Sequence, residues 1–199
     1  MFLSPRSYLC SSQKLVRSAK MKKEWDVVEV LKYARHDWLN KIQLIKGNLA
    51  LNRIDRANDI INTIVNESQH ESKLTSMNMR LFTGFVMTYH WYNHAVRLEL
   101  EVLGNAQDLS KYDNEVYRWC RYLTGLLESH IDYHADNYLS ISLCTEEQEP
   151  RFFFDFSGIL TDMQNLQEQL GSYEYGQMLT CVEQEMLPTE FNIQIKINT

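Results

Sequence analysis

Histidine is the residue type in this sequence with the most versatile chemistry, because an imidazole can accept a proton, a phosphoryl group or a metal ion near neutral pH. The chain contains six histidines, and His36 lies beside an acidic residue, Asp37. A neighbouring carboxylate can hold one ring nitrogen protonated and leave the other nitrogen as the nucleophile. Spacing alone leaves two interpretations of His36 open, a phosphoryl acceptor or a solvated surface histidine.

The segment around His36 predicts a long helix over residues 25–49, because it contains no Pro and only one Gly. Its apolar residues wind a stripe along one side of that helix: Val28, Leu31, Trp38, Ile42, Ile45 and Leu49. At about 100° per residue, His36 lies about 200° from Trp38, which places it on the flank or the solvent side. Asn40 and Gln43 fall within about 60° of His36, one and two turns further along.

A second helix is expected from residue 56 to about residue 74, after a break over residues 47–54 with Asp55 as its N-cap. Two helices joined by so short a connection form an antiparallel hairpin. A lone hairpin leaves its apolar stripe uncovered, and a second copy is the economical way to cover it. We therefore expect a dimeric four-helix bundle built from two hairpins.

The C-terminal part contains segments in which apolar and polar residues alternate, as in half-buried strands. Strands are expected at residues 96–102, 138–143, 151–156 and 191–197, and helices at 82–92 and 112–130, with one or two more within 160–187. This order predicts an α+β fold in which helices cover one face of a mixed sheet. The expected parts are a leader at residues 1–23, a helical hairpin at 24–78 and a C-terminal α/β domain at 79–199.

The net charge of −6 is unevenly distributed. Residues 1–23 hold six of the 20 Lys and Arg and no acidic residue, which indicates a disordered basic leader or sequence upstream of a true start at Met21. The rest of the chain is acidic and therefore a poor surface for direct nucleic-acid binding. Four widely spaced cysteines without a C-x-x-C motif favour free thiols in a reducing cytoplasm. No apolar run approaches the ~18 residues of a membrane span.

Four other histidines form two pairs spaced four residues apart, His90 with His94 and His130 with His134. Such pairs can chelate zinc on a helix, but neither contains the Glu of the H-E-x-x-H motif. The alternative, which the missing Glu favours, is that all four are ordinary surface histidines.

Residues 35–49, Arg-His-Asp-Trp-Leu-Asn-Lys-Ile-Gln-Leu-Ile-Lys-Gly-Asn-Leu, resemble the H-box of two-component histidine kinases. More narrowly, they resemble the sporulation initiation phosphotransferases of spore-forming bacilli, as do residues 70–74, 98–104 and 108–113. The resemblance covers roughly residues 24–199, and the H-box is its most specific part.

The resemblance implies a dimeric phosphorelay histidine phosphotransferase whose C-terminal domain is similar to the ATP-binding domain of histidine kinases. His36 would take a phosphoryl group from an aspartyl-phosphate on a single-domain response regulator and pass it to an aspartate of the sporulation master transcription regulator. Asp37 would orient the imidazole, and Asn40 would help to position the phosphoryl group. Candidate contacts to the receiver domain are Arg35, Gln43 and Lys41. No cofactor or metal site of its own is implied, since the receiver would bring Mg²⁺.

Two alternatives remain: a true histidine autokinase that uses ATP, and a non-catalytic dimeric adaptor that sequesters response regulators. The ATP site of such kinases needs an Asn-bearing helix and a D-x-G-x-G segment, whose counterparts here are Ser129 and Asp155-Phe-Ser-Gly158. The Asn and the glycines that follow the Asp are missing, in a chain with only 7 Gly. The sequence therefore predicts a phosphoryl carrier with a decayed nucleotide site, at which Asp155 could retain weak nucleotide binding.

A second histidine–acid pair, His70-Glu71, superficially mimics an H-box. It lies on the polar end of the second expected helix and lacks an Asn at the right spacing. We interpret it as a surface feature of the bundle, near the docking face.

Overall fold

The structure, a computed structural model, describes residues 26–146 and 149–198. The expected basic leader, residues 1–23, lies outside the described residues. The elements are α1 (Val27–Ala50), α2 (Ile54–Ser76), α3 (Arg80–Tyr89), β1 (Val96–Leu103), α4 (Asp113–His130), β2 (Asn137–Cys144), β3 (Arg151–Ser157), α5 (Met163–Gly171), β4 (Leu179–Leu187) and β5 (Glu190–Ile197). Two consecutive helices followed by an α/β domain are thus confirmed. The chain divides into two compact units, whose boundary in the sequence falls between Gln43 and Leu44.

The part of α1 that belongs to the first unit, residues 27–43, exposes apolar side chains. No residue of α1, all of which the structure describes, is buried. Trp38 and Ile42, two members of the expected apolar stripe, are 54% and 53% exposed. Soluble proteins rarely leave a contiguous apolar stripe in water, so this helix face calls for a partner surface.

Residues 51–53 form a tight connection to α2. Asn52 adopts a left-handed conformation with a φ of 55°, which Asn tolerates better than most residues. The expected break over residues 47–54 is too long, because α1 continues to Ala50. Asp55 lies in the first turn of α2 instead of capping it.

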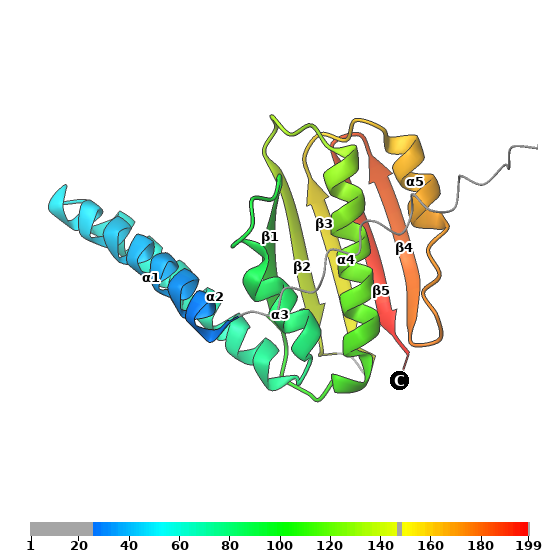
Figure 1. The fold of residues 1–199 in the computed structure, drawn as a ribbon, viewed down its shortest axis with the longest axis horizontal. Helices are drawn as coiled ribbons and strands as arrows, with labels where there is room; N and C mark the ends of the chain where they lie inside the picture. Colours follow the sequence, from blue (N-terminus) through cyan, green and yellow to red (C-terminus); the bar gives the residue numbers. More distant parts are fainter. Residues whose placement is uncertain (1–25, 147–148, 199) are drawn as a thin grey trace, which may run out of the picture. The chain divides into compact units, whose positions relative to one another are not determined.

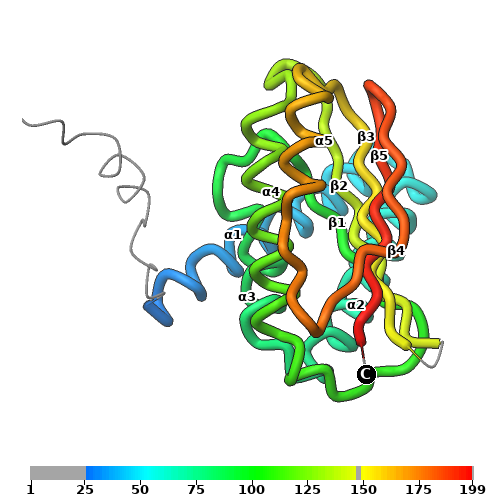
Figure 2. Tube along the Cα trace, turned by 90° about the vertical axis from the view of Figure 1, so that its right-hand side faces the viewer, coloured from blue at the N-terminus to red at the C-terminus, as the bar shows by residue number. Residues whose placement is uncertain are grey.

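Five strands form one mixed sheet in the order β1-β2-β3-β5-β4 (Figure 1). β1 and β2 are parallel, and the other neighbouring strands are antiparallel. Helices α3, α4 and α5 cover the same face of the sheet, as Figure 1 and the turned view of Figure 2 show, so the expected one-sided arrangement is confirmed. Phe154 of β3 is buried on that face and packs edge-on against Trp119 of α4, with ring centroids 5.9 Å apart.

Of the one or two helices expected within residues 160–187, the structure contains one, and the C-terminal part of that range is a strand that was not expected. Helix α5 ends at Gly171, and residues 179–187 form β4, which pairs antiparallel with β5 along one edge of the sheet. The polar run Glu183-Gln184-Glu185 suggests a helix, but an edge strand can carry such residues on its exposed side. A register shift between Cys181 and Glu183 also breaks the alternation that would have marked the strand.

Helix α3 occupies residues 80–89, against the expected 82–92. Its first turn is capped from a distance, because Asp113 at the start of α4 accepts hydrogen bonds from the amides of Leu81 (2.8 Å) and Phe82 (2.9 Å). The unpaired amides at a helix N-terminus favour a carboxylate acceptor. This bridge ties α3 to α4 and so helps to fix the helical layer over the sheet.

Candidate functional site

His36 lies near the middle of α1, with 72% of its side chain exposed. Its Nδ1 atom faces two side chains of the same helix. Asn40 Nδ2, one turn further on, lies 3.2 Å away, and Asp37 Oδ1 lies 3.8 Å away. The structure thus brings together three of the residues that the sequence singles out.

The Asn40 amide is within hydrogen-bonding distance of His36 Nδ1. Its N–H donates to Nδ1 when the ring carries its proton on Nε2. Turned over, the same amide offers its oxygen to a proton on Nδ1, which leaves a lone pair on Nε2. The Asp37 carboxylate adds an electrostatic attraction for a proton on Nδ1. Both side chains therefore act on Nδ1, and among the described residues the hydrogen bond and the ion pair of the ring are both at that atom.

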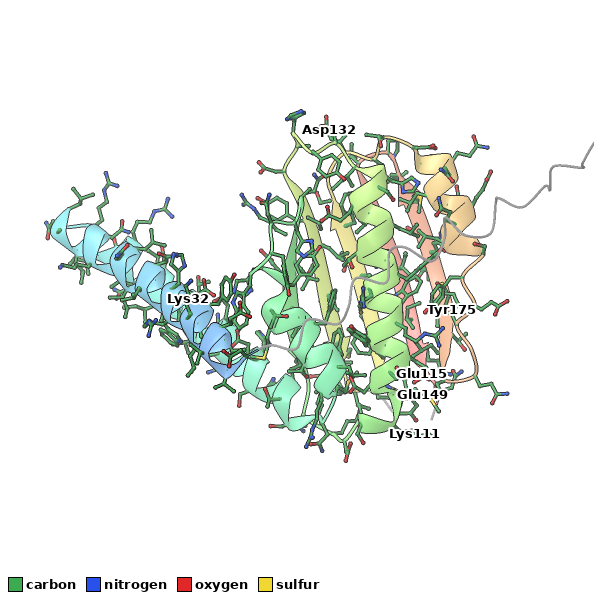
Figure 3. The ribbon with its side chains drawn as sticks, viewed as in Figure 1. Lys32, Lys111, Glu115, Asp132, Glu149 and Tyr175 are labelled. Atoms are coloured by element: carbon green, nitrogen blue, oxygen red, sulfur yellow. The ribbon has the colours of Figure 1, made fainter. Side chains whose placement is uncertain are left out.

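The remaining candidates lie on the same helix without contacting the imidazole. Arg35 and Gln43 are exposed, and neither is hydrogen-bonded to His36 within residues 26–146 and 149–198. Lys41 is half-buried and takes part in an interaction of its own. Sequence reasoning did not single out Lys32, an exposed cation on the turn before His36 (Figure 3). A search for charged residues at i, i+4 spacing could have found it.

The two positions expected at a nucleotide site do not converge. Ser129, on α4, donates its hydroxyl to the carbonyl of Leu126 at 2.8 Å. Asp155 follows Phe154 on β3 and, by the alternation of a strand, lies on the face of the sheet away from α4. There it accepts a hydrogen bond from the amide of Asn192. Ser129 and Asp155 therefore share no binding site, and weak nucleotide binding through Asp155 stays a prediction.

The two histidine pairs belong to no metal-binding cluster of three or more side chains among the described residues. Helix α3 ends at Tyr89, so His90 and His94 do not share a helix, and His94 instead stacks on Tyr89 with ring centroids 3.9 Å apart. Burial, with the nearby charge of Glu128 as a smaller cause, raises the pKa of the Tyr89 hydroxyl. The expectation of a surface histidine is wrong for His130, which is 6% exposed and lies at the buried end of α4.

The structure also bears on the cysteines, on the expected absence of a membrane span and on His70. Cys120, Cys144 and Cys181, the cysteines that the structure describes, are free thiols, as expected. In the described segments, no helix combines the length and the apolarity needed to cross a membrane. His70, expected on the surface of the bundle, is instead half-buried and bonded to β1.

The chain is similar to known proteins along most of its length. Two family models match it: "sensor kinase SpoOB-type, alpha-helical domain" over residues 16–77 and "sporulation initiation phospho-transferase B, C-terminal" over residues 78–198. Sporulation initiation phosphotransferase B of Bacillus subtilis (strain 168) is 36% identical over 139 residues, which cover 69% of this chain and 72% of that relative. Among solved structures, histidine kinase AdeS of Acinetobacter baumannii is 12% identical with a TM-score of 0.39, covering 82% of this chain and 97% of the other. At this TM-score, the similarity to the histidine kinase says nothing about the function of this chain.

Proposed function

The chain belongs to the sporulation initiation phosphotransferase B family, and on this premise we propose that it is a histidine phosphotransferase of a phosphorelay, with His36 as the phosphoryl acceptor. The surroundings of the His36 imidazole support its assignment as the phosphoryl acceptor. Nδ1 faces Asn40 and Asp37, while the imidazole as a whole is 72% exposed. A nucleophile that must meet a phosphoryl group on another molecule needs such access, because the two reacting atoms have to align.

In the first step, the Nε2 lone pair of His36 attacks the phosphorus of an aspartyl-phosphate on the donor receiver. A nitrogen–phosphorus bond forms, the acyl oxygen–phosphorus bond breaks, and the donor aspartate leaves as a carboxylate. The proton on Nδ1 stays on the ring, held by the Asn40 amide oxygen, so the phosphorylated ring carries a positive charge. The Asp37 carboxylate, 3.8 Å from Nδ1, stabilises that charge.

In the second step, a carboxylate of the acceptor receiver attacks the same phosphorus, and the neutral imidazole leaves. A phosphoramidate and an acyl phosphate both have high transfer potential, so the two steps are close to balanced and reversible. The contribution of this chain is then mostly positioning. Mg²⁺ held by the acidic residues of the receiver would neutralise phosphoryl charge, and this chain would need no cofactor or metal of its own.

A homodimer is part of the proposal. Apolar side chains of α1 and α2 are 41% to 54% exposed in the single chain: Trp38, Ile42, Leu49, Ile61 and Val65. A second copy would cover them in a four-helix bundle. Such a bundle suits a two-fold dimer, in which the same surface patch is used by both copies.

The proposed partners are two receiver domains. The donor is the receiver of a single-domain response regulator, and the acceptor is the receiver of the sporulation master transcription regulator. Cations favour contact with the acidic pocket of a receiver, which supports Arg35 and Lys41 as contacts alongside Gln43. The exchange would take place in the cytoplasm, without direct binding of nucleic acid or membrane.

Two sources of phosphoryl groups test this function. Purified protein is incubated with a radiolabelled phospho-receiver or with radiolabelled ATP alone, and acid-labile label on the chain is counted. We expect label from the phospho-receiver and none from ATP. Label from ATP alone would indicate an autokinase, and receiver binding without transfer would indicate a sequestering adaptor. Either result would overturn the proposal.

A further inference from the structure

The end of helix α2 contacts the edge of the sheet through two side chains that lie one turn apart. The amide of Val102 on β1 donates a hydrogen bond to Nδ1 of His70 (3.0 Å), and the ammonium of Lys73 donates to the carbonyl of the same Val102 (3.2 Å). Strand β1 lies at the edge of the sheet, where outward-facing backbone groups have no strand partner. His70 and Lys73 therefore take the place of a neighbouring strand at one residue.

The hydrogen bond to His70 requires one protonation state. Because the Val102 amide is the donor, Nδ1 must be unprotonated, so the ring is neutral and carries its proton on Nε2. A proton on Nδ1 would set two N–H groups against each other and add a positive charge one turn from Lys73. Val102 is fully buried, and a buried amide that loses its acceptor is unfavourable.

We propose that His70 is a proton-operated latch between α2 and β1, closed when its imidazole is neutral and open when the imidazole is protonated. The charged residues nearest to His70 along α2 are Glu67, Glu71 and Lys73. The charged residues of the two elements packed against α2 are Arg97, Glu99 and Glu101 of β1 and Arg80 of α3. The carboxylates favour protonation of the ring and the cations oppose it. Among the cations, Lys73 lies one turn from His70 on α2 and binds the same Val102, so its charge opposes protonation of His70 most directly.

Opening the latch would not release the whole end of the helix. Leu74, Met77 and Met79 are fully buried at the same junction. The amide of Leu109 also donates to the carbonyl of Met77 at 3.0 Å. These contacts hold the end of α2 in the core whatever the state of His70. Protonation therefore loosens the contact between α2 and β1 locally, without unfolding the domain.

Amide hydrogen exchange of Val102, measured by NMR on the full chain between about pH 5 and pH 8, tests the latch, because histidine ordinarily changes charge in this range. The protection factor, which corrects for the intrinsic effect of pH, is followed together with the imidazole signals of His70. We expect the protection of Val102 to fall about tenfold as His70 becomes protonated. The protection of Ile141, on the interior strand β2, should stay constant.

Two substitutions separate the effect of the proton from a purely structural one. His70→Asn places an acceptor oxygen at the position of Nδ1 but does not titrate, so Val102 should stay protected throughout. His70→Ala removes the acceptor, so protection of Val102 should be independent of pH and about tenfold lower than that of the wild type at about pH 8.

Three results would overturn the latch. The first is protection of Val102 in the wild type that is independent of the state of His70. The second is a wild-type pH dependence that persists in His70→Asn, and the third is exchange of Val102 in His70→Ala that is no faster than in the wild type at about pH 8. None of these readouts involves phosphoryl transfer, so the proposed latch can be refuted without refuting the proposed function, and the reverse also holds.

Discussion

The side-chain amide of Asn40 lies 3.2 Å from Nδ1 of His36, one turn along the same helix. The carboxylate of Asp37, which the sequence favours as the orienting group, is further away at 3.8 Å. An amide at hydrogen-bonding distance can select the tautomer of the ring, whereas a carboxylate at the longer distance acts mainly through its charge. On the proposed function the two roles would therefore separate: Asn40 would orient the imidazole, and Asp37 would stabilise the positive ring of a phosphohistidine.

Replacing Asn40 by Ala should lower the rate of phosphoryl transfer to His36 about tenfold, which corresponds to the loss of one hydrogen bond. The fold should be unaffected, because Asn40 is exposed. Single-turnover transfer from a phospho-receiver measures the rate. Asn48→Ala is the matched control, since the Asn48 amide also makes a hydrogen bond within α1, to the carbonyl of Leu44. Equal rates in the two variants would rule out a special role for Asn40.

Replacing Gly158 by Ala should lower the free energy of unfolding by about 2 kcal/mol. A Cβ atom at this position would lie 2.3 Å from Oδ1 of Asn137 and 2.6 Å from Cζ of Phe156. That Asn137 oxygen already accepts a hydrogen bond from the amide of Ile159, so it cannot move freely. Urea denaturation measures the change.

Gly125→Ala is the matched control for that experiment. Gly125 lies on α4, and a Cβ atom there would meet nothing within 4 Å. The substitution should therefore raise the free energy of unfolding by about 0.5–1 kcal/mol, as Ala does in place of Gly in a helix. A Gly158→Ala variant as stable as Gly125→Ala would contradict the described packing around Asn137.

Replacing Asp113 by Ala should destabilise the C-terminal domain by about 2 kcal/mol, because two amides at the start of α3 lose their acceptor. The affected amides are those of Leu81 and Phe82. Thermal or urea unfolding gives the magnitude, and exchange of the two amides gives the location. Asp59→Ala, an exposed change on α2, should stay within about 0.5 kcal/mol of the wild type. Unchanged exchange of Leu81 and Phe82 in the Asp113 variant would refute the cap.

Burial raises the pKa of the Cys120 thiol, so very little thiolate forms there at mildly alkaline pH. Cys144 and Cys181 are only half-buried. Alkylation at about pH 8, followed by peptide mapping, should label the latter two first and Cys120 only after unfolding. Equal labelling of all three in the native protein would show that Cys120 is not enclosed in the core.

The candidate site could be located from the sequence because its parts are local. His36, Asp37 and Asn40 lie within five residues of one helix, and helical spacing alone brings them to one side. The closer approach of Asn40 than of Asp37 to Nδ1 could not be foreseen, because it depends on the side-chain rotamers and not on the spacing alone.

Most of the fold could also be predicted, since alternation and helical periodicity mark elements that are apolar on one side. Strand β4 was not predicted because an edge strand with a register shift does not alternate cleanly. The contacts of His70 and Asp113 could not be predicted for another reason. Each joins residues about 30 positions apart in the chain, a pairing that no local pattern encodes.

The identity of the phosphorylated atom tests the central claim most directly. Wild-type protein and His36→Ala are incubated with the same phospho-receiver, and the label is located by mass spectrometry and by the phosphorus–nitrogen coupling in NMR. We predict a phosphoryl group on Nε2 of His36 in the wild type and none on the variant, which should remain folded because this side chain is 72% exposed. Label on another residue, or transfer that survives in His36→Ala, would contradict the account.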